Sequence, residues 1–200
     1  MDNPEVNAER NMTKFSDEEL MALVMDRNTR ALKTLYDRYG KSVFNFILRY
    51  TNNREISEDL LQETFTKVWF GAHTFHISRG TFKAWLFTIG INLTRNEMSR
   101  KRYSVHHIEI ENTSDEDEME YTGIGEPAGS FLEESELKDT IARALEKLNP
   151  LQKEVVILKH YQRMKFSEIA AITQTPEGTV KARFHKALAQ LKNILQKAEY

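Results

Sequence analysis

The segment between residues 71 and 81, GAHTFHISRGT, has a composition suited to holding an unpaired nucleic-acid base. Phe75 stands among His73, His76 and Arg79, and the segment contains no carboxylate. An aromatic ring can stack on a base while neighbouring cations hold its phosphates. The residues alone leave an equal alternative, in which Phe75 folds back onto its own domain. The two histidines have no third ligand nearby, so they do not indicate a metal site.

A row of hydrogen-bonding side chains follows in the next segment, which the apolar spacing predicts to be a helix. The apolar stripe consists of Phe82, Trp85, Leu86, Ile89 and Leu93. At about 100° per residue, Thr88, Asn92 and Arg95 line up beside this stripe. The segment then runs into the basic residues 100–102, whose charges suit a phosphate backbone.

A second basic surface is predicted near the C-terminus. A short apolar helix over 166–172, a turn over 173–175 and a long helix from Pro176 form a helix-turn-helix pattern. The residues predicted to face inward on the long helix are Val180, Phe184, Leu188, Leu191 and Leu195. Arg183 then points outward and can pair with guanine, while Lys186 can reach phosphate. The alternative is a solvated basic face on a helix that binds proteins.

The helix that precedes residue 71 carries a polar face without an evident partner. Leu60, Leu61, Phe65, Val68 and Trp69 recur on its apolar side. Asp59, Gln62 and Glu63 lie on the other side, where they can meet another protein.

Capping signals predict where several helices begin and end. Ser16 and Glu19 can form a capping box, and so can Asn149 and Gln152 around Pro150. Gly40 is predicted to end the helix that starts after Ser16. A further helix is predicted to end at residues 51–53, and its aromatic residues are predicted to lie in the hydrophobic core.

The composition indicates an all-α protein with two small domains. Apolar residues make up 40% of the 200 residues, glycine and proline are few, and no alternating pattern predicts a strand. Cysteine is absent, which excludes disulfides and thiolate sites and fits a reducing compartment. No apolar segment reaches the roughly 18 residues that span a bilayer, and none resembles a signal peptide. A cytoplasmic location is therefore expected.

Charge is strongly segregated along the chain. Residues 104–130 contain eight acids and no Lys or Arg, and the remaining residues carry 28 bases against 22 acids. Basic modules joined by an acidic tether fit a nucleic-acid-binding protein. We therefore expect a disordered tail over 1–14, a helical domain over 15–103, a flexible acidic linker over 104–130 and a helix-turn-helix domain over 131–200.

Two strings in the chain carry a family resemblance. EDLLQETFTKVW, followed by RGTFKAWLFTIGIN, resembles the sigma-two domain of the extracytoplasmic-function (ECF) group of sigma-70-family initiation factors. ALEKLNPLQKEVVILKHYQRMKFSEIAAITQTPEGTVKARFHKALAQL resembles the sigma-four domain of the same group. The matches cover roughly residues 20–102 and 132–195, in the order that the group shows.

The resemblance implies a specificity subunit of bacterial RNA polymerase with no catalytic site, cofactor or metal of its own. Docking on the core enzyme is carried over to Asp59, Gln62, Glu63 and Phe65. Capture of the melted minus-ten element is carried over to Ala72, Phe75, Arg79, Thr88, Asn92 and Arg95. Reading of the minus-thirty-five duplex is carried over to Thr179, Lys181, Arg183 and Lys186. The implied partners are core RNA polymerase, promoter DNA and an anti-sigma protein.

The chain departs from the group's pattern at two positions. Gln174 stands where glycine is usual in the turn, and Lys165 stands where a serine or threonine cap is usual. A left-handed Gln174 costs about 1 kcal/mol, and a missing cap costs about as much. Both should lower the stability of the motif and leave its outward face unchanged.

Other functions account for less of the chain. A free-standing operator-binding regulator would use only the helix-turn-helix and leaves the polar face of residues 59–63 unexplained. A scaffold that binds only proteins leaves the charge segregation and the Phe75 segment unexplained. For the acidic tether three uses stay open: imitation of RNA within the polymerase, shielding of the basic modules, and a plain spacer.

Overall fold

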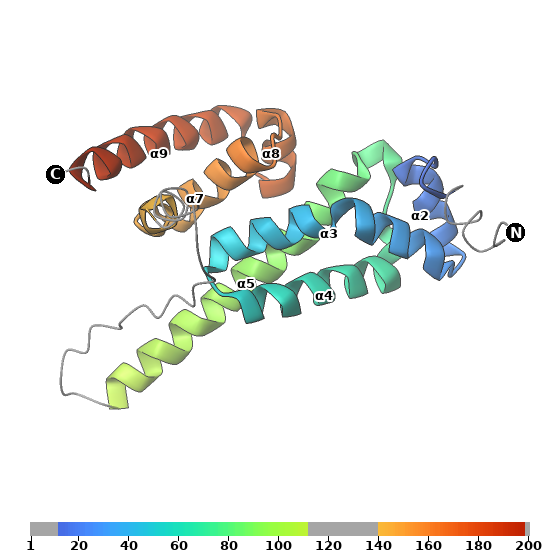
Figure 1. Cartoon of the computed structure of the whole chain (residues 1–200), viewed down its shortest axis with the longest axis horizontal. Helices are drawn as coiled ribbons and strands as arrows, with labels where there is room; N and C mark the ends of the chain where they lie inside the picture. Colours follow the sequence, from blue (N-terminus) through green and yellow to red (C-terminus); the bar gives the residue numbers. More distant parts are fainter. Residues whose placement is uncertain (1–11, 112–139, 199–200) are drawn as a thin grey trace, which may run out of the picture.

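The computed structural model describes residues 12–111 and 140–198, and every regular element in these ranges is helical (Figure 1). The first domain contains α2 (Asp17–Met25), α3 (Thr29–Thr51), α4 (Arg54–Gly71), the 3₁₀ turns η1 (Ala72–Thr74) and η2 (Ile77–Arg79), and α5 (Phe82–Glu111). The second contains helical residues 140–146, α7 (Pro150–Val156), the π-helical segment η3 (Ile157–Tyr161), α8 (Phe166–Thr173) and α9 (Glu177–Ala198). The all-α class predicted from the sequence is confirmed.

The helix ends follow the predicted capping signals. The Ser16 hydroxyl accepts from the backbone N–H of Glu19 at 3.2 Å, and the Glu19 carboxylate accepts from the N–H of Ser16 at 2.7 Å. Asn149 and Gln152 form the same reciprocal pair at the start of α7. Asn52 ends α3 in the left-handed region at φ 52°, a conformation that asparagine tolerates better than most residues. These ends depend on local chemistry, which the sequence alone contains.

Three predicted boundaries were wrong. Gly40 does not end a helix, because α3 continues through it and both halves of α3 pack into one hydrophobic core, which outweighs the roughly 1 kcal/mol cost of the glycine. α5 runs to Glu111, past the boundary at 103, since residues 104–111 contain no helix-breaking residue. The tail boundary predicted at 14 is too late, because Met12 already packs on the hydrophobic core. The tail over 1–11, the tether from 112 to 130 and the helix start predicted at 131 lie outside the described residues.

Helices α3, α4 and α5 pack together and form most of the first domain (Figure 1). Two of the three aromatic residues predicted for the hydrophobic core are there: Phe46 and Tyr50 of α3 are buried, and Phe46 meets Phe87 of α5 edge to face. Phe44 is only partly buried and lines the groove between α3 and α4. A Cβ atom at Gly90 would lie 3.6 Å from Val43 and 3.7 Å from the Thr64 hydroxyl. At Gly90, α5 therefore lies within van der Waals contact of both α3 and α4.

The two domains share a continuous hydrophobic core. The cluster that contains Phe46 and Leu86 of the first domain also contains Leu158, Ile169 and Ile172 of the second. α8 contacts α5, η3 contacts α3, and Figure 1 shows the second domain lying along α3. A smaller cluster around Leu145 and Ala187, residues of the second domain, holds the helical residues 140–146 and α7 against α9.

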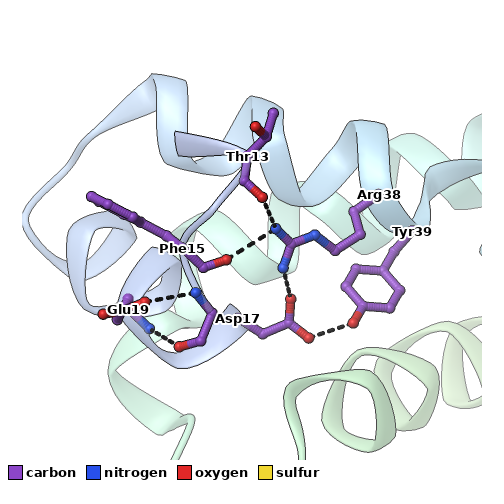
Figure 2. A network of polar contacts seen from close by, with 7 residues as sticks. Thr13, Phe15, Asp17, Glu19, Arg38 and Tyr39 are labelled. Atoms are coloured by element: carbon purple, nitrogen blue, oxygen red, sulfur yellow. Dashed lines mark hydrogen bonds and ion pairs between the residues drawn. The ribbon is translucent and has the colours of Figure 1, made fainter. Parts of the chain in front are cut away.

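A polar network ties the chain before α2 to α3 (Figure 2). Arg38 donates to the carboxylate of Asp17 and to the backbone oxygens of Phe15, at 3.0 Å, and Thr13, at 3.3 Å. The Tyr39 hydroxyl donates to the other oxygen of Asp17. Burial raises the pKa of the Tyr39 phenol above its ordinary value, and the hydrogen bond to Asp17 raises it further. Asp17, the first residue of α2, is therefore the acceptor that joins the start of α2 to α3.

Replacing Asp17 with Asn is expected to lower the free energy of unfolding by about 1–3 kcal/mol, because charge-assisted hydrogen bonds from Arg38 and Tyr39 are weakened together. Denaturant unfolding of the full chain measures this. The matched control is Asp37→Asn in the exposed pair with Lys33, for which about 0.3–0.5 kcal/mol is expected. Equal losses in the two variants would show that the Asp17 network contributes no more than a surface pair.

Candidate nucleic-acid interface

A pocket of about 280 Å³ opens where the segment 74–81 meets the first turns of α5. This volume lies just below the range of roughly 300–1,000 Å³ that is typical of small-molecule sites. Its wall includes Phe75, Arg79 and Thr88, three of the residues expected to hold the melted strand. Arg79 is exposed, and the Thr88 hydroxyl is partly occupied by donation to the Ala84 carbonyl at 2.9 Å. Aromatic rings and arginine are the residue types that commonly hold an unpaired base.

Phe75 itself is buried, with 5% of its surface exposed. Its ring lies 6.0 Å from the ring of Phe82, edge to face, and 5.5 Å from the ring of Trp85. This is the alternative in which Phe75 folds back onto its domain. The ring therefore borders the pocket from within the hydrophobic core and offers no free face in this conformation.

The remaining residues of the expected minus-ten set lie apart from the pocket. Asn92 is exposed on α5, one turn beyond Thr88, and Ala72, the first residue of η1, is buried. Arg95 is held by Glu154 of α7 through two hydrogen bonds of 2.8 and 2.7 Å. The hydrogen bonds to Glu154 raise the pKa of Arg95 above its ordinary value, although burial opposes the rise. Of the row along α5, Asn92 is therefore exposed, whereas Thr88 and Arg95 already make hydrogen bonds within the protein.

The helix-turn-helix is formed as predicted, with α8 and α9 separated by a turn at Gln174. Gln174 adopts φ 51° and ψ 42°. This is the left-handed conformation that glycine, the usual residue at this position, adopts without strain. The Lys165 side chain makes no cap, but its backbone N–H donates to the Glu168 carboxylate at 2.6 Å. One half of a capping box therefore offsets part of the expected loss.

The outward face of α9 carries the four residues expected to meet duplex DNA. Thr179 and Lys186 are exposed. Lys181 pairs with Glu177 at 2.7 Å, and the half-buried Arg183 lies 3.4 Å from the Thr175 hydroxyl. Leu188, predicted to face inward, is instead 43% exposed. The small Ala187 occupies the buried position because α9 lies close to α7 there.

A groove of about 880 Å³ runs between α3 and α4 and is mainly apolar. Gln62 and Phe65 of the expected docking set line it, together with Tyr36 and Trp69. Phe65 is buried and meets the Tyr36 ring edge to face at 4.8 Å. Asp59 and Glu63 are exposed on the same helix but do not line the groove, and Glu63 lies 3.6 Å from Lys67.

Two residues with structural roles were missed by sequence reasoning. Glu154 is 1% exposed and Gln162 is 8% exposed, and both bond to the first domain. The sequence could have indicated that Glu154 is buried. It stands three residues before Ile157 and four before Leu158, which places an acid on an apolar helix face. A buried charge there requires a partner.

Other kinds of site find no support in residues 12–111 and 140–198. No group of three or more His, Cys, Asp or Glu side chains in these ranges could hold a metal ion. Among the helices described, none is long and apolar enough to cross a bilayer.

Comparison with known proteins matches both halves of the chain to one family. The model of sigma-70 region 2 matches residues 35–103, and that of sigma-70 region 4 matches residues 138–191. The ECF RNA polymerase sigma factor SigW of Bacillus subtilis is 29% identical, over 83% of this chain and 89% of its own. The ECF RNA polymerase sigma-E factor of Salmonella typhimurium is 28% identical, over 92% of this chain and 96% of its own.

Solved structures agree with this result. The sigma factor RpoE of Bartonella quintana, solved with the anti-sigma factor NepR, is 26% identical and has a TM-score of 0.63. The match covers 82% of this chain and 96% of that one. With regions 2 and 4 in order and a helix-turn-helix at the second, the chain belongs to the ECF group of the sigma-70 family.

Proposed function

We propose that this protein binds core RNA polymerase and directs it to promoters through three separate surfaces. The groove between α3 and α4, with the exposed face of α4, is the docking site for the polymerase. The pocket at the start of α5 takes a base of the melted minus-ten element. The outward face of α9 reads the minus-thirty-five duplex. The observation that carries the proposal is the presence of regions 2 and 4 in one chain.

The chemistry of each surface suits its proposed ligand. Duplex DNA exposes its base code in the major groove, which admits a helix such as α9. An unpaired base must leave the stack and enter a pocket, which the junction of η2 and α5 provides. A mainly apolar groove with a polar rim is typical of a protein interface. A free-standing operator-binding regulator would have no use for this groove.

Run-off transcription with purified core RNA polymerase tests the proposal. The full chain should bind core enzyme and produce defined transcripts from genomic promoter fragments that core enzyme alone does not transcribe. A chain that bound duplex DNA but neither bound core enzyme nor supported initiation would be an operator-binding regulator instead.

Docking is expected to depend on Gln62 and Glu63. Gln62→Arg puts a charge into the mainly apolar groove, and Glu63→Lys reverses the charge beside it. Either change should weaken binding to core enzyme about tenfold or more, as loss of one well-placed interface residue does. Surface-immobilised core enzyme gives the dissociation constants. Glu55→Lys, exposed in the first turn of the same helix, is the control and should bind like the unmodified chain.

We further propose that an anti-sigma protein holds this chain inactive, in the cytoplasm where the polymerase works. The support is the solved complex of Bartonella quintana RpoE with the anti-sigma factor NepR. Purification of the tagged full chain from its native cell tests this, because a stoichiometric protein other than polymerase subunits should accompany it.

A further inference from the structure

The second domain covers the pocket that is proposed to take a base. Ala171 and Ile172 of α8 line this pocket together with Phe75 and Arg79 of the first domain. Ile172 is 3% exposed and belongs to the same hydrophobic cluster as Phe75. A strand of DNA cannot enter the pocket from this side while α8 stays in place.

One ion pair joins the two domains further along α5, seven residues beyond Thr88 of the pocket wall. Both nitrogens of the Arg95 fork donate to Glu154, one to each carboxylate oxygen, at 2.8 and 2.7 Å. The Glu154 side chain is 2% exposed, whereas the Arg95 side chain is 33% exposed. The carboxylate depends on the arginine for its neutralisation, while the arginine keeps contact with water.

Three more contacts cross the same boundary. The side-chain amide of Gln162 donates to the Ser42 carbonyl at 3.1 Å, and Lys83 donates to the Gln162 carbonyl at 3.2 Å. The Arg49 guanidinium lies 4.2 Å from the centre of the Tyr161 ring. The last turns of α7–η3 are thereby fastened to α3 and to the start of α5.

We propose that the Arg95–Glu154 pair is a latch that holds the second domain over the base pocket while the chain is free of polymerase. The proposal rests on the assignment of Arg95 and the pocket to minus-ten DNA made above. Arg95 has one planar fork, and Glu154 occupies it in the same bidentate way that a phosphate would. While Glu154 holds the Nε–Nη2 edge, Arg95 cannot offer that same edge to a phosphate in the bidentate way.

The closed arrangement covers the base pocket but leaves the DNA-reading face of α9 exposed. Thr179 and Lys186 of α9 stay exposed in the closed arrangement. The closed chain should accordingly keep its duplex-reading face available and withhold only the single-strand site. Recognition of an unpaired base would then require the domains to separate, which docking on polymerase can drive.

Geometry argues that the pair favours closure despite the cost of burying a carboxylate. A buried ion pair offsets its desolvation only when the geometry is good and each charge is satisfied. Here the pair is bidentate, and no buried side-chain polar atom in the described parts of the chain lacks a hydrogen-bond partner. The partial exposure of Arg95 also reduces the desolvation that closure requires.

The test measures the distance between the domains in the full chain. The sequence has no cysteine, so nitroxide labels can be attached at Glu55→Cys in α4 and Lys192→Cys in α9, both exposed positions. The unmodified chain should give one narrow distance distribution. Glu154→Arg, which opposes two cations, should broaden and lengthen it, and so should Arg95→Glu. The charge swap Arg95→Glu with Glu154→Arg should restore the narrow distribution.

A second measurement follows access to the pocket. The probe is a fluorescent pool of random single-stranded DNA 12-mers, without polymerase. Glu154→Arg should bind it about tenfold more tightly or better than the control Asp37→Arg, which changes the net charge equally at an exposed pair on α3. Binding to a random duplex should differ little between the two variants, because the α9 face is exposed in both states. Gln162→Ala, an uncharged change at the same boundary, covers the case in which Glu154→Arg does not fold.

The outcomes separate the latch from the proposed function. A narrow, unchanged distance in Glu154→Arg and in Gln162→Ala would overturn the latch, whatever run-off transcription shows. A longer distance without tighter single-strand binding would overturn the claim that closure hides the pocket. A restored distance in the charge swap, with tighter single-strand binding in Glu154→Arg, supports the latch even if the chain fails to support transcription.

Discussion

Replacing Phe75 with Ala is expected to lower the free energy of unfolding by about 3–5 kcal/mol, the range for removing a buried phenylalanine. The ring is 5% exposed and packs against Phe82 and Trp85, so its loss leaves a cavity beneath the base pocket. Stacking on a base would account for only about 1–3 kcal/mol. Destabilisation should therefore dominate, and thermal unfolding of the full chain measures it.

Phe75→Leu separates packing from stacking. Leucine keeps most of the buried apolar volume, so the cost should stay below about 1.5 kcal/mol, but it offers no aromatic face. If Phe75 only supports the pocket wall, this variant should initiate transcription nearly as well as the unmodified chain. If the ring turns outward to stack on a base in the open complex, promoter opening should fail and a pre-melted template should rescue it. A Phe75→Ala chain of unchanged stability would contradict the packing role.

Elements whose ends depend on local chemistry could be predicted from the sequence. The boxes at Ser16 and Asn149 involve residues three positions apart, so the sequence contains both partners. The left-handed turn at Gln174 followed in the same way from a missing glycine. The prediction that a helix ends at Gly40 was wrong, because the contacts of α3 with α4 and α5 decide that the helix continues. No local sequence pattern contains these contacts.

In the candidate site, too, features set by local sequence could be predicted and features set by tertiary contacts could not. Outward positions on α9 follow from helical periodicity, and Thr179 and Lys186 are exposed as expected. Leu188 was predicted to face inward, but its neighbour Ala187 is buried instead, because the small side chain fits where α9 lies close to α7. The orientation of Phe75 could not be predicted, since it depends on whether Phe82 and Trp85 leave room for the ring.

In the sequence, the only indication of the contact between the domains was the charge of Glu154 on the apolar face of its helix. Arg95 looked like one member of an exposed row, and its pairing with Glu154 joins positions 59 residues apart. Such a pair depends on how two folded units meet, which periodicity within each unit does not specify. The same limit explains why a continuous hydrophobic core across the domains was not expected.

Replacing Arg183 with Ala is expected to weaken binding to a cognate minus-thirty-five duplex by about 1–3 kcal/mol and to relax selectivity at one base pair. Arg183 is half-buried, and within the described residues its guanidinium makes one long side-chain contact, 3.4 Å from the Thr175 hydroxyl. Little stabilises the guanidinium there, so it is available for a paired contact with guanine, the commonest specific contact of arginine in the major groove.

Lys186→Ala is the matched comparison on the same face. Lys186 is exposed and, as a point charge, suits phosphate, so its loss should weaken all sequences alike and reduce the salt dependence of log Kd by about one unit. Fluorescence anisotropy with cognate and single-substituted duplexes over a range of salt concentrations distinguishes the two effects. Base selectivity unchanged in Arg183→Ala, or changed in Lys186→Ala, would mean that the assignment of base and phosphate contacts along α9 must be redrawn.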